Sequence, residues 1–381
     1  MIPRAVIWPF LLLWGCDIPS CGAPPNPERP GAGRAEWIFR TAGQPTTPTV
    51  FADTSIAIGS AGGRVVRIGA DGAVRWSVDA RGPVVGLAKS FDDRTLLVGA
   101  VRGGAGAIVA LDAATGRTRW EQATDSAPLP SARPDGVIVA ASTDVRFFTA
   151  QGSPRGSYDV GKELAPVAPA LLEDGSIAIA MNDGTIAWLD GAGSERFRSG
   201  DARLAHANSL EAIAGGGVAV LAEGHLAVLD SGGRDVLRMD GSYRGRLGVL
   251  RGGGFVVVGG DGRVSALGPD GRVRWRRNFE RSRGEGEDRE VLETPVDVAA
   301  AHDGGAYVVV AKGVDGRLRR VVRLSAAGRV LWREKLVGLA IEARPLALPH
   351  ALILPTGHWN HRVAKTPGGE IGHDRVTRFR D

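Results

Sequence analysis

The residues best suited to chemistry are four histidines near the end of the sequence. His358 and His361 are separated by two residues in GHWNHR, and His350 and His373 lie nearby. Imidazoles at short spacings are common zinc ligands. We find no cysteine or carboxylate that completes the set, and an H-x-x-H on a strand and turn points its two side chains apart. We therefore expect no metal site here.

A second group of polar residues suited to metal binding is a series of aspartates that recurs along the chain: Asp71, Asp112, Asp190, Asp230 and Asp270. Carboxylates bind calcium when several converge on one point. These aspartates occur once per repeat of the sequence, and each lies within four residues before a turn glycine, which is typical of tight turns. No serine, histidine and acid form the pattern of a nucleophile elbow. We therefore predict neither catalytic residues nor enzymatic activity.

The turn aspartates belong to a phrase that recurs through the chain. Its clearest copy is IVALDAATGRTRWE, from Ile108 to Glu121, and blurred copies begin at Val65, Ile186, Leu226, Val264 and Val321. Each copy has an apolar run, a turn with Asp or Gly, and a second run that ends on a large side chain, which indicates a β-hairpin. We predict that each of these large side chains packs at the end of its hairpin and helps to hold the repeats together, and we call them clasps: Trp37, Trp76, Trp120, Phe197, Leu237, Trp275 and Trp332.

The spacing of the repeat predicts the fold. The turn glycines are Gly72, Gly116, Gly152, Gly193, Gly233, Gly271, Gly328 and Gly369, roughly 42 residues apart on average. Units of about 40 to 50 residues with four strands are typical of β-propeller blades. We predict an all-β, eight-bladed propeller of four-stranded antiparallel blades, and seven blades remain possible because the last unit is poorly patterned.

Two segments depart from the regular repeat. AEWIFRTAG, from Ala35 to Gly43, resembles the fourth strand of a blade without its first three, so we expect the last unit, from Pro345, to borrow this strand and close the ring. The longer interval between Gly271 and Gly328 contains ERSRGEGEDRE, from Glu280 to Glu290, whose charge predicts a solvated loop.

The N-terminal segment predicts export. Arg4 precedes an apolar run from Ala5 to Trp14, which is too short to span a bilayer and is typical of a signal peptide. Leu13-Trp14-Gly15-Cys16 resembles the lipobox of bacterial lipoproteins, which implies lipidation at Cys16. The predicted organisation is a signal peptide at 1–15, a Pro- and Gly-rich tether at 16–34, and the propeller at 35–381. The alternative is an ordinary signal peptide, with Cys16 and Cys21 paired or removed.

Charge adds one more candidate surface. The chain has 381 residues and a net charge of +5, carried mostly by arginine. Arg272, Arg274 and Arg276 alternate with apolar residues, so one face of a predicted outer strand is basic, which discourages edge-to-edge pairing. The functional alternative is a basic rim, extended by Arg277, Arg281 and Arg283, that contacts anionic lipid or an acidic partner. We expect no nucleic-acid partner for an exported protein.

The repeat resembles the pyrroloquinoline-quinone-type propeller repeat. Its closest copy places Leu111, Asp112, Thr115, Gly116 and Trp120 at the expected positions. Quinoprotein dehydrogenases share this repeat but hold their quinone with adjacent disulfide-bonded cysteines and a calcium ion. The only cysteines here are Cys16 and Cys21, before the domain, so we expect no cofactor.

A second family with this repeat, the BamB-like propeller lipoproteins of the outer-membrane barrel-assembly machine, combines a lipobox and tether with eight blades and no catalytic site. This resemblance implies a lipid-anchored, non-enzymatic scaffold of the bacterial envelope that faces the periplasm or surface. Its expected partners are envelope proteins, among them an outer-membrane barrel component. The alternatives are a small-ligand or glycan sensor, or a quinoprotein-like oxidoreductase that uses the central channel.

Overall fold

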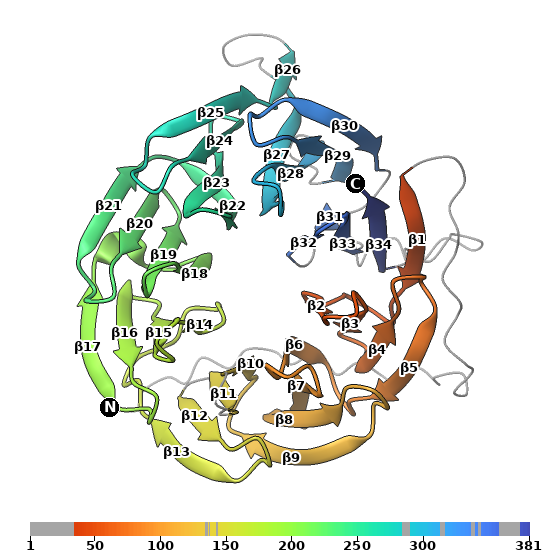
Figure 1. Cartoon of the computed structure of the whole chain (residues 1–381), viewed down its shortest axis with the longest axis vertical. Coiled ribbons are helices and arrows are strands. Elements are labelled where there is room, and N and C mark those ends of the chain that lie inside the picture. Colours follow the sequence, from red (N-terminus) through yellow and green to blue (C-terminus); the bar gives the residue numbers. More distant parts are fainter. Residues whose placement is uncertain are drawn as a thin grey trace, which may run out of the picture.

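The chain folds into a ring of β-sheets around a central axis (Figure 1). The computed structural model describes residues 34–133, 136, 138–141, 144–283, 290–312, 317–336, 340–341, 344–357 and 374–381. Within these residues the strands form eight antiparallel sheets, six of them four-stranded and two five-stranded. The predicted all-β propeller is therefore confirmed, and the sheets number eight rather than seven.

The strands follow one another from the axis to the rim in each blade. Blade 1 consists of β2 (Thr49–Val50), β3 (Ile56–Gly59), β4 (Arg64–Ile68) and β5 (Val74–Asp79). Blade 2 consists of β6 (Val84–Lys89), β7 (Thr95–Arg102), β8 (Ala105–Asp112) and β9 (Thr118–Thr124). Blade 3 consists of β10 (Leu129–Ala132), β11 (Ile138–Ala141), β12 (Val145–Phe148) and β13 (Pro154–Tyr158). Blade 4 consists of β14 (Ala170–Leu171), β15 (Ile177–Ala180), β16 (Thr185–Leu189) and β17 (Glu195–Gly200).

The second half of the ring repeats this order. Blade 5 consists of β18 (Ser209–Ile213), β19 (Gly217–Ala222), β20 (His225–Leu229) and β21 (Asp235–Asp240), and a single 3-10 turn, Ala202–Leu204, precedes it. Blade 6 consists of β22 (Tyr243–Leu250), β23 (Gly254–Gly259), β24 (Arg263–Leu267) and β25 (Val273–Asn278). Blade 7 consists of β26 (Arg281–Arg283), β27 (Glu290–Ala300), β28 (Ala306–Lys312), β29 (Arg317–Leu324) and β30 (Val330–Lys335).

Blade 8 joins the two ends of the described chain. It consists of β31 (Ala340–Ile341), β32 (Leu346–Leu348), β33 (Ala351–Gly357), β34 (Arg375–Arg380) and, on the outside, β1 (Ala35–Arg40). β1 pairs antiparallel with β34, with Trp37 opposite Arg378 and Phe39 opposite Val376. The early strand therefore closes the ring, as its sequence predicts, because β1 pairs with the last strand of blade 8 and the chain then continues into β2 of blade 1.

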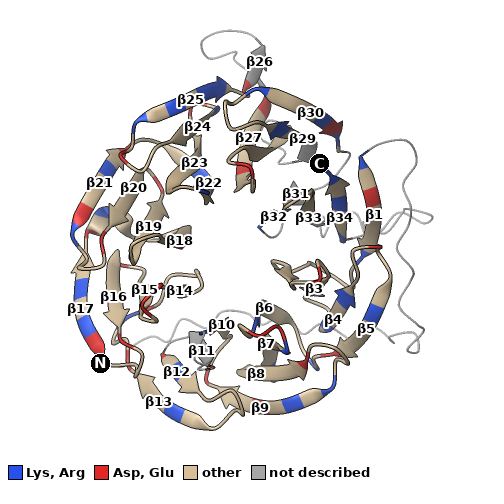
Figure 2. Ribbon diagram, in the orientation of Figure 1, with Lys and Arg blue, Asp and Glu red and all other residues tan. Residues whose placement is uncertain are grey.

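The hydrophobic core lies between the blades. The middle strands are apolar on both faces because each face packs on a neighbouring blade: every residue of β19 is buried, as are the first six of β7. One buried cluster joins Val98 of blade 2 to Val65 of blade 1, and another joins Val308 of blade 7 to Val256 of blade 6. The outer strands contact solvent and carry most of the rim charge, as along β17 and β25 (Figure 2).

The charged insertion differs from its prediction. The prediction of a solvated loop over Glu280–Glu290 is wrong at both ends of that segment. There β26 pairs with β27, with Ser282 opposite Val291 and Arg283 opposite Glu290. The backbone groups at both ends of the insertion bond to one another and extend β27 beyond the blade. Side-chain charge does not oppose such a two-stranded extension, because backbone groups alone form its hydrogen bonds. Residues 284–289 lie outside the described part.

Candidate functional site

Six of the predicted clasp residues pack against a turn glycine of the next blade. The ring of Trp76, on the outer strand of blade 1, lies against Gly116 in the last turn of blade 2, where an added Cβ would be 2.9 Å from the indole. The Trp76 indole N–H donates to the Ala113 carbonyl of blade 2 at 2.8 Å. The same arrangement recurs in five further pairs: Trp37 and Gly72, Trp120 and Gly152, Phe197 and Gly233, Leu237 and Gly271, and Trp275 and Gly328.

The turn glycines are required for two reasons at once. Gly116 has φ of +71° and Gly152 has φ of +86°, a backbone region that other residues adopt only with strain. The absent side chain also leaves the space that the neighbouring aromatic ring fills. The glycine that marks each of these turns in the sequence therefore also provides the space into which the clasp side chain of the preceding blade packs. Gly369, the predicted turn glycine of the last unit, lies outside the described residues.

Blade 3 uses a different residue for the same contact. At the clasp position of β13 the sequence has Gly156, which lies opposite Phe147 of β12. Phe147 is 2% exposed and its ring reaches the turn of blade 4, where a Cβ added to Gly193 would be 2.6 Å away. In blade 3 the aromatic clasp therefore lies on the third strand, whereas the six clasps named above lie on the outer strands of their blades. The sequence pattern does not identify Phe147, because the repeat places its large side chain on the outer strand.

Trp332 and Arg323 of blade 7 bind one carboxylate of blade 8. The Trp332 indole N–H donates to Asp381 at 3.4 Å, and Arg323, directly opposite Trp332, binds the same carboxylate at 2.9 and 3.1 Å. Arg323 is 2% exposed, also pairs with Asp303 at 2.9 Å and lies over the Tyr307 ring. Burial acts to lower the pKa of Arg323, but the two carboxylates outweigh it and raise that pKa above its ordinary value.

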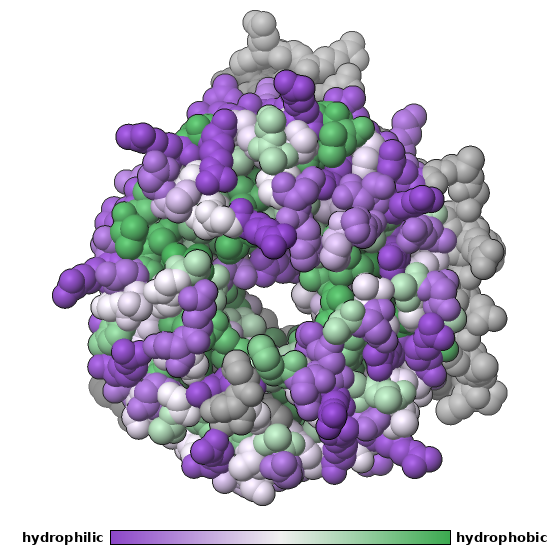
Figure 3. All heavy atoms as spheres, in the orientation of Figure 1, coloured by the Kyte–Doolittle hydropathy of each residue, from purple (hydrophilic) through white to green (hydrophobic). Residues whose placement is uncertain are grey.

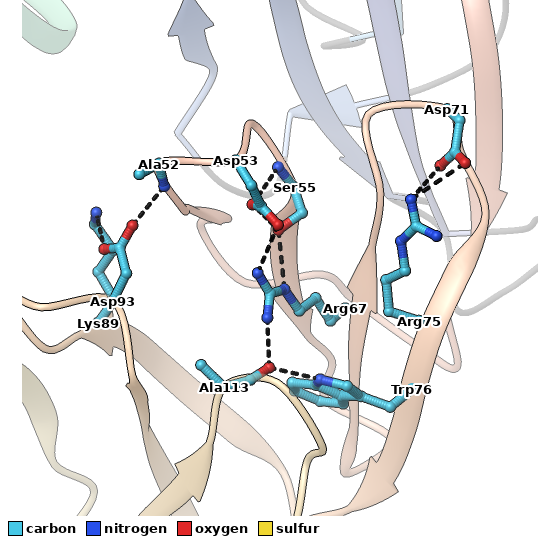
Figure 4. Close-up of polar contacts among 10 residues, drawn as sticks. All are labelled: Ala52, Asp53, Ser55, Arg67, Asp71, Arg75, Trp76, Lys89, Asp93 and Ala113. Atoms are coloured by element: carbon cyan, nitrogen blue, oxygen red, sulfur yellow. Dashed lines mark hydrogen bonds and ion pairs between the residues drawn. The ribbon is translucent and has the colours of Figure 1, made fainter.

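The junction of blades 1 and 2 shows how polar contacts supplement a clasp (Figure 4). Arg67 lies over the Phe51 ring and donates to Ser55 at 2.9 Å and to Asp53 at 2.9 Å. A third donor of Arg67 reaches the Ala113 carbonyl at 2.6 Å, the same oxygen that accepts from Trp76. One carbonyl of blade 2 therefore receives two bonds from blade 1.

The turn aspartates serve the turns in which they lie. Asp71 accepts from the backbone of Ala73 at 3.0 Å, and Asp112 accepts from Thr115 at 2.9 Å. Hydrogen bonds from Arg119 and Thr115 lower the pKa of Asp112 to about 2. Asp190, Asp230 and Asp270 bind the backbone of their own turns in the same way. These contacts explain the residue type without a metal.

A central channel opens along the axis of the ring (Figure 3). It has a volume of about 820 Å³ and is lined by the innermost strands of several blades. Arg344 of blade 8 crosses it to form an ion pair with Glu211 of blade 5, and donates to the Leu247 carbonyl of blade 6 at 2.9 Å. The backbone N–H of Arg344 donates to Thr47 of blade 1 at 3.3 Å. Arg344 thus binds groups on both sides of the channel.

A second ion pair lines the same wall. Arg246 binds Asp297 at 3.1 Å, and the fully buried Asp297 carboxylate also accepts from the backbone of Val298 at 2.9 Å. Burial raises the pKa of Asp297, and the Arg246 guanidinium opposes that rise. Both channel arginines therefore bind a carboxylate. Among the residues that line this cavity, the Ser209 hydroxyl donates to the Glu211 carboxylate at 3.1 Å, and that carboxylate also pairs with Arg344.

The remaining predicted chemical groups fall in different places. His350 is exposed on the surface, and His358, His361, His373, Cys16 and Cys21 lie outside the described residues. Among the residues that the structure describes, no group of three His, Cys, Asp or Glu side chains could hold a metal ion. The same part of the chain contains no helix of the length and apolarity needed to cross a membrane.

Comparison with known proteins supports the architecture. The family model described as outer membrane protein assembly factor BamB matches residues 28–163. The crystal structure of BamB from Moraxella catarrhalis superimposes with a TM-score of 0.61 and 18% identity, over 90% of this chain and 96% of that one. The chain has a BamB-like β-propeller architecture.

Other solved propellers also resemble this chain in fold. Sqt1 from Saccharomyces cerevisiae has a TM-score of 0.65 and 13% identity, over 90% of this chain and 98% of that one. A streptogramin B lyase has a TM-score of 0.53 and 14% identity, over 71% of this chain and 93% of that one. A comparison with curated protein sequences finds no match. At these identities the likeness is one of fold, which binding proteins and enzymes share.

Proposed function

We propose that this chain is a non-enzymatic, lipid-anchored propeller that binds other proteins of the bacterial envelope, in the process of outer-membrane protein assembly. The match of residues 28–163 to the BamB family model carries the proposal. The lipobox-like Leu13–Cys16 and the tether to residue 34 support the anchor. The ion pairs of the channel support a structural role for its two arginines, because Arg344 and Arg246 each bind a carboxylate.

The mechanism is geometric. Clasps and interblade ion pairs hold the blades as a rigid ring, and the turns at the blade edges present contact surface without ordering on binding. A specific protein interface needs roughly 1,200–2,000 Å² of buried surface in total, which several adjacent turns supply together. Rigid presentation at the rim is therefore what the fold contributes.

The test is cross-linking of the full-length protein in its native membranes, followed by purification and identification of partners. The wild type is compared with Cys16→Ser, and Cys21→Ser serves as the matched control. We expect recovery of an outer-membrane barrel protein with the wild type and with Cys21→Ser, and weakened recovery with Cys16→Ser. No stable partner with the wild type contradicts the scaffold. Equal loss in both variants contradicts the lipid anchor and favours a disulfide between the two cysteines.

The channel favours one alternative, a sensor of small ligands or glycans. Its volume of about 820 Å³ falls within the roughly 300–1,000 Å³ of ligand pockets. A thermal-shift screen of envelope sugars tests this role, with Glu211→Gln as the variant that releases Arg344. A melting temperature that rises with one sugar in the wild type and not in Glu211→Gln supports the sensor. The quinoprotein alternative predicts a new absorbance band after addition of quinone and calcium.

A further inference from the structure

An exposed aromatic side chain lies at the edge of blade 2. Phe91 is 75% exposed, the highest value among the large apolar residues that the structure describes. It occupies the turn between β6 and β7, directly after the residue whose backbone N–H closes that turn. The corresponding positions of blades 1, 4 and 7 hold Ala52, Glu173 and His302. The turn itself therefore does not require an aromatic residue.

The turn that carries Phe91 is held in place from both sides. Asp92 accepts from the Ser90 hydroxyl at 2.6 Å and from the Arg94 backbone at 3.1 Å. The Asp93 carboxylate binds Lys89 and the backbone N–H of Ala52 in blade 1 (Figure 4). Phe91 is thus displayed on a fixed backbone, and a partner that binds it orders little of the chain.

A groove begins beside Phe91 and runs between blades 2 and 3. It has a volume of about 600 Å³, and the ring of Trp120 forms part of its wall. Trp120 is only partly buried, although it donates to the Ala150 carbonyl at 2.9 Å and lies against Gly152. Two aromatic rings therefore border one groove.

Arginines outnumber acidic residues in the lining of the groove. The lining includes Arg94, Arg119 and Arg133 and one acidic residue, Asp92, although Arg133 is buried and donates to the Gly191 carbonyl at 2.8 Å. Arg94 is 78% exposed, and its Nε lies 3.9 Å from Asp92. Arg119 is fixed by Asp112 at 2.7 Å and by Thr95 at 3.0 Å. A complementary partner has negative charge next to an apolar side chain.

We propose that this groove, named the Phe91 groove, docks an acidic segment of a partner protein. An aromatic side chain of that segment inserts between Phe91 and Trp120, and its carboxylates lie against Arg94 and Arg119. Aromatic and arginine side chains at the centre of a groove are the usual anchors of protein interfaces. The inference rests on the proposed function and names the surface and the partner chemistry through which the scaffold acts.

The test measures binding of a defined peptide to the purified full-length protein. The probe is a fluorescein-labelled peptide with one tryptophan between pairs of acidic residues, and a control peptide has alanine in place of that tryptophan. We expect fluorescence anisotropy to report binding of the probe and at least about tenfold weaker binding of the control peptide. We expect Phe91→Ser and Arg94→Glu to weaken binding of the probe by about tenfold or more. His302→Ser, at the same turn position of blade 7, leaves probe binding unchanged.

Each outcome decides between the groove and the wider function. Absence of probe binding, or equal binding by Phe91→Ser and the wild type, overturns the groove. Because Phe91 is a surface residue, its variant is expected to keep the wild-type melting temperature, which separates lost binding from lost fold. If membrane cross-linking still recovers the same partner with Phe91→Ser, the groove is refuted and the scaffold stands. If the wild type recovers no partner, the scaffold itself fails.

Discussion

Replacement of Trp76 by alanine tests the idea that the clasps hold neighbouring blades together. Trp76 is 9% exposed and lies between its own blade and the Gly116 turn of blade 2. Buried Trp→Ala substitutions cost about 3–5 kcal/mol, through lost burial and the cavity that remains. The lost indole hydrogen bond contributes about 1 kcal/mol of this. The Ala113 carbonyl keeps its 2.6 Å bond from Arg67, so no buried acceptor is left unpaired.

Trp120 provides the comparison within the same ring. The sequence predicts that Trp120 is buried, and replacement of a buried tryptophan by alanine lowers the free energy of unfolding by about 3–5 kcal/mol. The structure corrects this value, because the ring is partly exposed to the Phe91 groove. Less apolar surface is buried, and we expect Trp120→Ala to cost about 2 kcal/mol. Trp76→Phe, which keeps most of the packing, is expected to cost about 1–2 kcal/mol.

The assay is urea unfolding at 25 °C, followed by far-ultraviolet circular dichroism and by tryptophan fluorescence. Coincidence of the two transitions permits a two-state free energy of unfolding for each variant. We expect the loss of unfolding free energy to be largest for Trp76→Ala, smaller for Trp120→Ala and smallest for Trp76→Phe. A Trp76→Ala variant that loses less than about 1 kcal/mol refutes the clasp. Equal losses for Trp76→Ala and Trp120→Ala refute the link between ring burial and cost.

Three further predictions concern turns, pH and the rim. Gly152→Ala places a Cβ 2.5 Å from the Trp120 ring, whereas Gly104→Ala, at a similar positive φ, meets nothing within 4 Å. Calorimetry should therefore show Gly104→Ala losing about 1 kcal/mol from backbone strain and Gly152→Ala losing at least about 1 kcal/mol more; similar melting temperatures contradict this. Asp112 has its pKa lowered from 3.8 to about 2 by Arg119 and Thr115, so its contribution to stability is present above pH 3.8 and is lost as the pH falls towards 2. Urea midpoints measured across this range should fall less steeply for Asp112→Asn, and an unchanged slope sinks the assignment. Charge reversal at Arg274 and Arg276, on the exposed outer strand β25, should reduce solubility more than partner recovery; normal solubility with lost membrane or partner association favours the basic rim as a binding surface.

Much of the fold was predictable because its signals are local. Alternation of apolar residues, turn chemistry and a period of roughly 42 residues depend only on neighbouring positions. Gly116 and Gly152 were identified as turn residues, and both have the positive φ of a tight turn. The early strand from Ala35 was identified as the missing outer strand because it matches the phase of the repeat. Strand pairing within the charged insertion was missed, since composition describes side chains and not the backbone bonds between its two ends.

The candidate surfaces were harder to predict. Phe91 stands out only when the turns of several blades are aligned with one another, because an aromatic residue in one turn is unremarkable by itself. The Phe147 replacement at blade 3 becomes visible only once its register opposite Gly156 is known. Arg344 and Glu211 are separated by 133 residues, and no periodic pattern links them.

The sequence by itself determined most of the strands, the turns, the repeat and the positions of most of the large clasp side chains, because these follow from local backbone and side-chain preferences. The tertiary structure alone decided that the clasps reach the following blade, that Arg344 crosses the channel and that a basic groove opens beside Phe91. The reason is geometric. Closure of eight blades into a ring sets the angle between neighbours, and that angle brings together side chains that are far apart along the chain.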